Sequence, residues 1–132
     1  MKIVVDTNVL LRSAVRDDER QARIADQILD SASQAFLTLP CLCEFVWVLS
    51  RSYKLDRQAI VSALTRLMNA QNMVMDRNAV ESGIAALCSG ADFADGVIAY
   101  EGAWLGGETF VSFDKRAVQV LAGQGQKAKL LS

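Results

Sequence analysis

The fold class of this 132-residue chain is decided near its N-terminus, by residues 2–8, KIVVDTN. Their apolar run predicts a short strand over Lys2–Val5 that is buried, because a half-buried strand alternates apolar with polar residues. Asp6 ends the strand, and residues from Asn8 to Val15 have a helical pattern. A buried strand that passes directly into a helix is the first part of a βαβ unit.

The same alternation of short apolar strands and longer helical patterns continues along the chain. Further strands are expected at Ala35–Leu39, Asn72–Met75, Glu108–Phe113 and Lys129–Leu131. Helices are expected from Asp17 or Asp18 to Ser31, from Pro40 to about Tyr53, from Asp56 onward, from Asp76 to about Gly90, over residues 92–104, and from Asp114 to Leu121. This order predicts one α/β domain over residues 1–132, with a central parallel sheet between two layers of helices.

The composition excludes several kinds of chemistry. The chain has no histidine, which rules out Ser-His-Asp and Cys-His catalysis and histidine metal ligands. The three cysteines, Cys41, Cys43 and Cys88, form no C-x-x-C pair, and they are expected to be buried thiols in a reducing compartment. The groups that remain available for catalysis are carboxylates, hydroxyls and amines, together with metal ions held by oxygen ligands.

Charge and hydropathy bear on partners and location. The 14 basic and 15 acidic residues give a net charge of −1, which by itself argues against a nucleic-acid partner. No signal peptide is evident, because the first apolar run stops at Asp6. The longest uncharged stretch, between Asp30 and Glu44, has 13 residues and is too short to span a membrane. We therefore expect a soluble cytoplasmic protein without a membrane partner.

Two acids follow predicted strands directly. Asp6 follows the first strand, and Asp114 follows the strand that ends at Phe113. In parallel sheets, sites form beyond the carboxyl ends of strands, which makes both carboxylates candidate site residues. Each is equally interpretable as a helix N-cap. Ser112 is positioned to support a carboxylate with its hydroxyl, or lies in the strand.

Three further acids lie in predicted helices. Glu44 is the one charge in the apolar segment 40–49, where an unpaired carboxylate is costly unless it holds a metal, faces solvent, or pairs with Arg12 or Arg51. Asp92 and Asp95, three residues apart, share one face near a helix N-terminus. Capping explains Asp92 well. It explains Asp95 less well, because the apolar residues 97–99, which include Ile98, are expected to be buried.

Carboxylates gathered in one crevice repel one another unless a cation lies between them. Because the chain has no histidine and no cysteine cluster, the fitting cation is a hard one, Mg²⁺ or Mn²⁺. Such an ion activates water and stabilises charge on a phosphoryl group. The acids therefore indicate metal-dependent hydrolysis of a phosphodiester.

The candidate acids lie in four segments: residues 6–10 (DTNVL), Glu44 followed by VWVL at 46–49, residues 92–99 (DFADGVIA) and residues 112–114 (SFD). In this order, the four segments resemble the PIN-domain family, and within it the VapC toxins of bacterial type II toxin–antitoxin pairs. It covers essentially the whole chain. One departure is Gly96, where the family more often has a small residue with a Cβ. We expect this glycine to loosen its helix by up to about 1 kcal/mol.

The resemblance implies an α/β sandwich and a Mg²⁺- or Mn²⁺-dependent endoribonuclease. The family's acidic quartet corresponds to Asp6, Glu44, Asp95 and Asp114. Asp92 matches an additional acid, and the polar supporting positions correspond to Thr7 or Asn8 and to Ser112. The resemblance also implies a homodimer and a cognate antitoxin protein whose tail enters the acidic cleft.

Other interpretations stay open. A PIN-domain nuclease with a housekeeping role in RNA processing, and no antitoxin, has the same sequence features. A receiver-like signalling module also binds Mg²⁺ at strand ends, but it requires paired acids near the first strand, where this chain has only Asp6. Candidate RNA-guiding cations are Arg12, Arg16, Arg51, Lys54, Lys115 and Arg116.

Overall fold

A computed structural model describes every residue from Met1 to Ser132. The chain divides into two units, Met1–Asp76 and Arg77–Ser132. All strands pair in parallel and alternate with helices, so the predicted α/β class is confirmed. No helix has the length and apolar character needed to cross a lipid bilayer.

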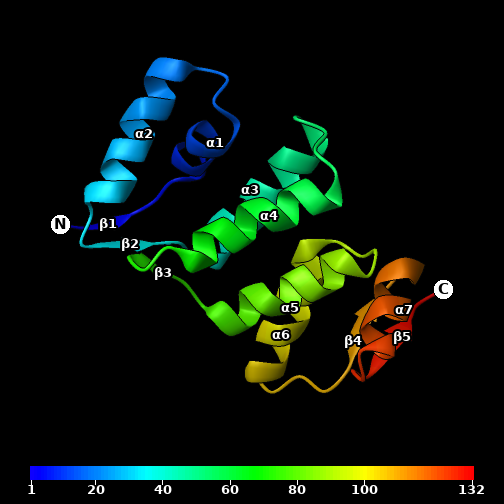
Figure 1. Cartoon of the computed structure of the whole chain (residues 1–132). Coiled ribbons are helices and arrows are strands. Elements are labelled where there is room, and N and C mark those ends of the chain that lie inside the picture. The colour runs from blue at the N-terminus through cyan, green and yellow to red at the C-terminus, as the bar shows by residue number, and fades with distance from the viewer. The chain divides into compact units, whose positions relative to one another are not determined.

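The first unit contains a three-stranded parallel sheet in the order β1-β2-β3 (Figure 1). Its elements are β1 Lys2–Val4, α1 Thr7–Val15, α2 Glu19–Ser31, β2 Gln34–Phe36, α3 Leu39–Arg51, α4 Arg57–Asn69 and β3 Met73–Val74. In the register, Ile3 lies opposite Ala35, and Ala35 lies opposite Met73. The helices confirm the sequence-based expectation, whereas the strands are shorter than expected at one or both ends. The expected burial of the first strand is wrong, because Lys2 and Val4 are exposed.

Local signals explain where these helices begin. The Asp18 carboxylate accepts a hydrogen bond from the Gln21 N–H at 3.0 Å, and Asp56 accepts one from the Ala59 N–H at 2.8 Å. Pro40 lies in the first turn of α3, where its missing N–H costs no hydrogen bond. Each N-terminus was predictable because its capping residue acts within three positions of itself.

The core of the first unit is formed by apolar residues from α1, α3 and α4. Its fully buried members include Leu10, Leu42, Phe45, Leu49, Ile60 and Leu64. At the surface, α1 and α2 are joined through Asp26, which accepts hydrogen bonds from Ser13 Oγ and from the Arg16 guanidinium, both at 2.6 Å. These two bonds hold α1 and α2 together. Asp6, the first candidate acid, directly precedes α1.

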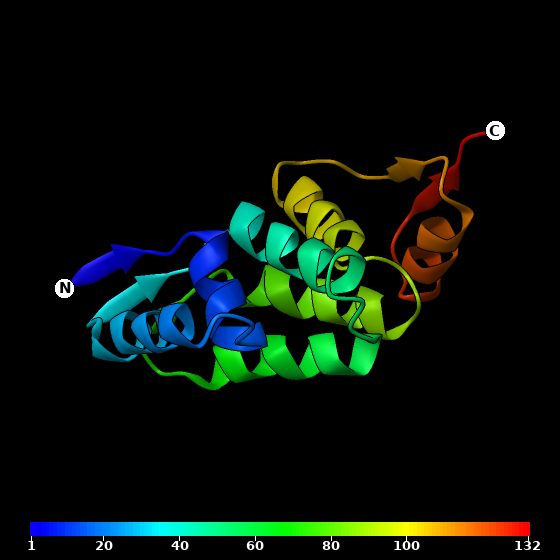
Figure 2. The same cartoon turned by 90° about the horizontal axis from the view of Figure 1, so that it is seen from above.

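The second unit contains a two-stranded parallel sheet. Its elements are α5 Arg77–Cys88, α6 Phe93–Trp104, β4 Phe110–Ser112, α7 Lys115–Gly123 and β5 Ala128–Leu130. Val111 lies opposite Lys129 in the β4–β5 register, and Figure 2 shows both strands beside α7. The expected last strand is therefore confirmed. Gly123, expected just beyond the helix, is its final residue.

Two glycines allow α5 and α6 to approach closely. A Cβ on Gly96 would collide with the Ser82 carbonyl oxygen and would lie 2.8 Å from the Gly83 Cα. A Cβ on Gly83 would lie 2.6 Å from the Phe93 ring, which is itself buried. The expectation that Gly96 only loosens its helix is wrong, because the missing side chain is what lets the two backbones touch.

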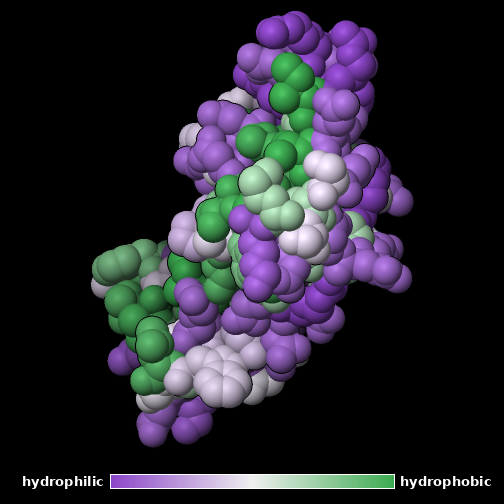
Figure 3. Space-filling view, turned by 90° about the vertical axis from the view of Figure 1, so that its left-hand side faces the viewer, coloured by the Kyte–Doolittle hydropathy of each residue, from purple (hydrophilic) through white to green (hydrophobic).

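Some apolar side chains expected in the interior lie at the surface. Ile98, expected to be buried beside Asp95, is 57% exposed, and Cys88 is also exposed. Figure 3 shows hydrophobic residues reaching the surface between hydrophilic ones on the face it presents. Of the three cysteines, Cys41 alone is fully buried as expected.

Candidate functional site

Asp6 follows β1 and takes the N-cap position of α1, but its carboxylate is not used for capping. Its backbone has the extended conformation of an N-cap residue (φ −79°, ψ 152°), and its side chain accepts no capping hydrogen bond. The side chain is exposed. An N-cap acid whose carboxylate makes no capping bond retains both oxygens for another partner, so capping does not explain this residue.

Glu44 lies on α3 and makes no ion pair. The alternative partner Arg12 instead donates hydrogen bonds to Gln21 at 2.6 Å and to Asp17 at 3.4 Å. Glu44 is exposed, as the solvent-facing interpretation expected. However, it faces a cavity of about 340 Å³ that Asp6 also lines. The structure thus brings together two acids that lie 38 positions apart in the sequence.

The same cavity holds three uncharged polar side chains: Thr7, Thr38 and Cys41. Thr7 is 6% exposed, and its side chain hydrogen-bonds with Cys41. Burial raises the pKa of the Cys41 thiol, and the negative charges of Asp6 and Glu44 raise it further. The thiol is therefore protonated at neutral pH and is a weak nucleophile.

Cys41 and Thr38 were missed in the sequence. The signal for Cys41 was its spacing, because residues three apart on a helix share a face and Glu44 is three positions further on. Asn8, an expected supporting residue, does not line the cavity, whereas Thr7 does.

In the second unit, Asp92 takes the N-cap position of α6 and Asp95 lies one turn further on. The Asp92 N–H donates a hydrogen bond to the Asp95 carboxylate at 3.2 Å, and the Asp95 N–H donates one to the Asp92 carbonyl at 3.1 Å. Asp95 therefore stabilises the helix start with one oxygen. A capping role and a site role are compatible for this residue, because a carboxylate has a second oxygen.

Asp114 is a true N-cap. Its carboxylate accepts hydrogen bonds from the Arg116 and Ala117 N–H groups at 3.0 and 3.1 Å, through the same oxygen. Ser112 supports it from the preceding strand, since the Ser112 hydroxyl accepts a hydrogen bond from the Asp114 N–H at 2.9 Å. The contact fixes the backbone of Asp114 and leaves its second carboxylate oxygen without a hydrogen bond.

These three acids of the second unit interact electrostatically. Burial raises the pKa of Asp95 above its ordinary value, and the negative charges of Asp92 and Asp114 raise it further. The hydrogen bond from the Asp92 N–H acts in the opposite direction. A cation bound beside these carboxylates would stabilise the ionised form of Asp95.

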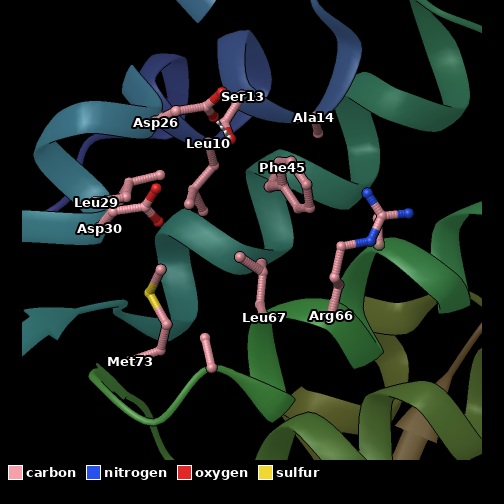
Figure 4. A pocket seen from close by; sticks show the side chains of 12 residues that line it. Leu10, Ser13, Ala14, Asp26, Leu29, Asp30, Phe45, Arg66, Leu67 and Met73 are labelled. Carbon is pink, nitrogen blue, oxygen red and sulfur yellow. Dashed lines mark hydrogen bonds between the residues drawn. The ribbon is translucent and has the colours of Figure 1, made fainter. Parts of the chain in front are cut away.

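Another cavity of the first unit, about 190 Å³, lies among α1 to α4 (Figure 4). Its lining is mainly apolar and includes Leu10, Phe45, Leu67 and Met73. Of its two carboxylates, that of Asp26 is already bonded to Ser13 and Arg16. The cavity therefore lacks a set of convergent reactive groups, and the acid-lined cavity is the better candidate site.

The structure thus places the five predicted acids in two groups, Asp6 with Glu44 in the first unit and Asp92, Asp95 and Asp114 in the second. The structure contains no group of three or more histidine, cysteine, aspartate or glutamate side chains that could hold a metal ion. A pair of carboxylates suits Mg²⁺, which binds through one or two carboxylates and keeps several of its waters. The donor chemistry fits a hard divalent cation.

Comparison with known proteins gives one family. The family model described as "PIN domain" matches residues 3–121 and so runs through both units. No curated protein matches the chain. PIN domains are generally nucleases that use divalent metals. Because the match covers most of the sequence, the chain belongs to the PIN-domain family.

Proposed function

We propose that this protein is a Mg²⁺-dependent endoribonuclease that acts as the toxin of a type II toxin–antitoxin pair in the cytoplasm. Its site consists of Asp6, Glu44, Asp95 and Asp114, with Asp92 as a fifth acid. Both groups of acids bind divalent ions, and Mn²⁺ replaces Mg²⁺. Thr7 and Ser112 support the acids beside them.

The pairing of Asp6 with Glu44 is the observation that supports this proposal most. Two carboxylates from different elements face one cavity, and neither forms an ion pair. Two carboxylates that line one cavity supply oxygen ligands of the kind that Mg²⁺ prefers. Capping does not account for Asp6 and ion pairing does not account for Glu44, whereas a solvent-facing Glu44 agrees with its exposure.

Each residue has a defined task in the proposed reaction. A bound divalent ion lowers the pKa of a coordinated water and stabilises negative charge on a phosphoryl group. Asp6 and Glu44 supply oxygen donors from the first unit, and Asp95 and Asp114 supply them from the second. The Ser112 hydroxyl accepts a hydrogen bond from the Asp114 N–H at 2.9 Å and so holds the backbone at this acid. Thr7, the buried neighbour of Asp6 in the sequence, hydrogen-bonds with Cys41 in the same cavity.

The distribution of charge supports an RNA substrate. If the five acids share a metal-filled cleft, 10 acidic residues remain against 14 basic ones on the rest of the chain. The net charge of −1 thus includes a concentrated negative site on a mildly basic remainder. An acidic cleft is also complementary to a basic antitoxin tail.

The ends of the RNA products test the chemistry. Hydrolysis by water does not need the RNA 2′-hydroxyl, so products carry 5′-phosphate and 3′-hydroxyl ends. Cleavage stops when Mg²⁺ is chelated, and Asp6→Asn abolishes it in a folded protein. Products with 2′,3′-cyclic phosphate ends, or full activity of Asp6→Asn, would contradict the proposed site.

A housekeeping RNA-processing nuclease is the second candidate, because it is compatible with the same acids. Induced expression in a bacterial host separates the two roles. A toxin arrests growth, and co-expression of the protein encoded by the adjacent gene relieves the arrest. Sustained growth during induction of an active enzyme would favour the housekeeping role. The oligomeric state, expected to be a homodimer, is measured by light scattering.

A further inference from the structure

Arg116 lies at the start of α7, two positions after Asp114, and its side chain reaches the end of α5. A Cβ on Gly90 would lie 3.3 Å from both the Cζ and the Nε of Arg116, so the guanidinium lies against the Gly90 backbone. Gly90 has a φ of +102°, which favours glycine. The guanidinium is therefore held next to the segment that leads into Asp92.

The turn that ends α5 explains why the Arg116 side chain can approach the Gly90 backbone. The Ala91 N–H donates a hydrogen bond to the Ala86 carbonyl at 3.0 Å, and the Gly90 N–H donates one to Leu87 at 3.3 Å. This is the Schellman pattern that closes a helix with a glycine. Because the glycine has no side chain, the guanidinium of Arg116 approaches the backbone directly.

Arg116 makes no ion pair, although Asp92, Asp95 and Asp114 lie in the same unit. One oxygen of the Asp114 carboxylate is occupied by two backbone N–H groups, and Asp95 accepts from the Asp92 N–H. Gly90 is two positions before Asp92, so their Cα atoms are at most about 7 Å apart. Arg116 is exposed and has no acidic partner, so its guanidinium N–H donors are available for an external anion.

We propose that Arg116 binds a phosphate of the RNA strand beside Asp92, Asp95 and Asp114, an inference that rests on the proposed endoribonuclease function. A guanidinium recognises phosphate with paired N–H donors, and its contact with Gly90 lowers the conformational entropy lost on binding. The carboxylates bind cations and repel phosphate, so the nearby Arg116 supplies the attraction that holds the backbone of the strand at the site.

The structure also offers a purely structural role, since a cation near the C-terminus of α5 interacts favourably with the helix dipole. The two roles differ in their dependence on salt. A phosphate contact displaces a counterion from the nucleic acid, and for single strands each contact adds about 0.7 to the slope of log Kd against log salt concentration. A contact within the protein leaves this slope unchanged.

The test measures binding of a fluorescent single-stranded RNA by anisotropy, in the non-cleaving Asp6→Asn parent with Mg²⁺ present, between about 50 and 200 mM salt. Adding Arg116→Gln should weaken binding about fivefold and reduce the slope by about 0.7. Arg116→Lys should keep the slope and lose part of the affinity. The control is Lys129→Gln, an exposed cation of β5 in the same unit, which should change affinity less than twofold.

Each contrary outcome has a definite meaning. An unchanged slope with a lowered melting temperature in Arg116→Gln would overturn the inference in favour of the structural role. Equal effects of Arg116→Gln and Lys129→Gln would overturn it as well, because they would indicate general charge attraction. Failure of the parent to bind RNA at all would instead contradict the proposed function on which the inference rests.

Discussion

Asp6 and Asp114 occupy equivalent places in the chain, each two positions beyond the last residue of a strand and just before a helix. Their side chains nevertheless differ in use. Asp114 accepts two backbone hydrogen bonds, whereas Asp6 accepts none from the helix that it precedes. Sequence alone does not separate these cases, because the choice depends on side-chain rotation and not on position.

Substitution of Asp114 should separate its capping role from its proposed catalytic role. Asn caps a helix about as well as Asp, so Asp114→Asn should leave the free energy of unfolding close to that of the wild type. Asp114→Ala should lose about 1 kcal/mol. Both variants should lose RNA cleavage, since neither has the charge. Denaturant unfolding and cleavage assays check this, and an active Asp114→Asn would remove the carboxylate from the site.

Asp95 should make the metal-free protein less stable as pH rises. Its folded pKa is raised, so the folded state prefers the protonated form. The destabilisation is absent well below the pKa of about 3.9 of an unfolded Asp, and grows as pH rises through the folded value. Asp95→Asn keeps an acceptor for the Asp92 N–H and has no charge to penalise.

Thermal unfolding in EDTA, followed from about pH 3 to pH 7, measures this effect. The melting temperature of Asp95→Asn should match that of the wild type at the acidic end and exceed it at neutral pH. Added Mg²⁺ should then stabilise the wild type more than the variant. A difference that is constant across the pH range would show that charge on Asp95 is not its cause.

The N-termini of the helices were predicted well from the sequence. The contacts between helices were predicted poorly. Asp18 and Asp56 cap α2 and α4 as expected, because each bonds to an N–H three residues away. Gly96 was misinterpreted, since its role depends on Ser82, a residue of another helix. Ile98 was assigned to the core from its apolar neighbours, although one face of α6 is exposed there.

The two glycines of α6 provide a matched test of this account. Gly96→Ala should cost about 1–3 kcal/mol, because its methyl group meets backbone atoms of α5 that have little freedom to move. Gly102→Ala, with no atom within 4 Å of the new Cβ, should instead gain about 0.5–1 kcal/mol from helix propensity. Urea unfolding measures both, and a stabilising Gly96→Ala would contradict the close approach of α5 and α6.

At the scale of the whole molecule, the sequence predicted the alternation of strands and helices and the acids at strand ends. Parallel pairing was predictable because short buried strands linked by helices have few other arrangements. The Thr7–Cys41 contact beside the acids was not, since it depends on packing between α1 and α3. Cys41 was accordingly considered only as a buried thiol, although it lies one helical turn from Glu44.

The central claim is that the predicted acids bind divalent metal ions. Binding of Mn²⁺, followed by the loss of the free-ion signal in electron paramagnetic resonance, tests this without any RNA. Asp6→Asn in the first unit and Asp95→Asn in the second should each weaken Mn²⁺ affinity by about tenfold or more. Glu101→Gln, an exposed acid of α6, should leave the affinity unchanged. No Mn²⁺ binding by the wild type, or an affinity that neither substitution changes, would contradict the account.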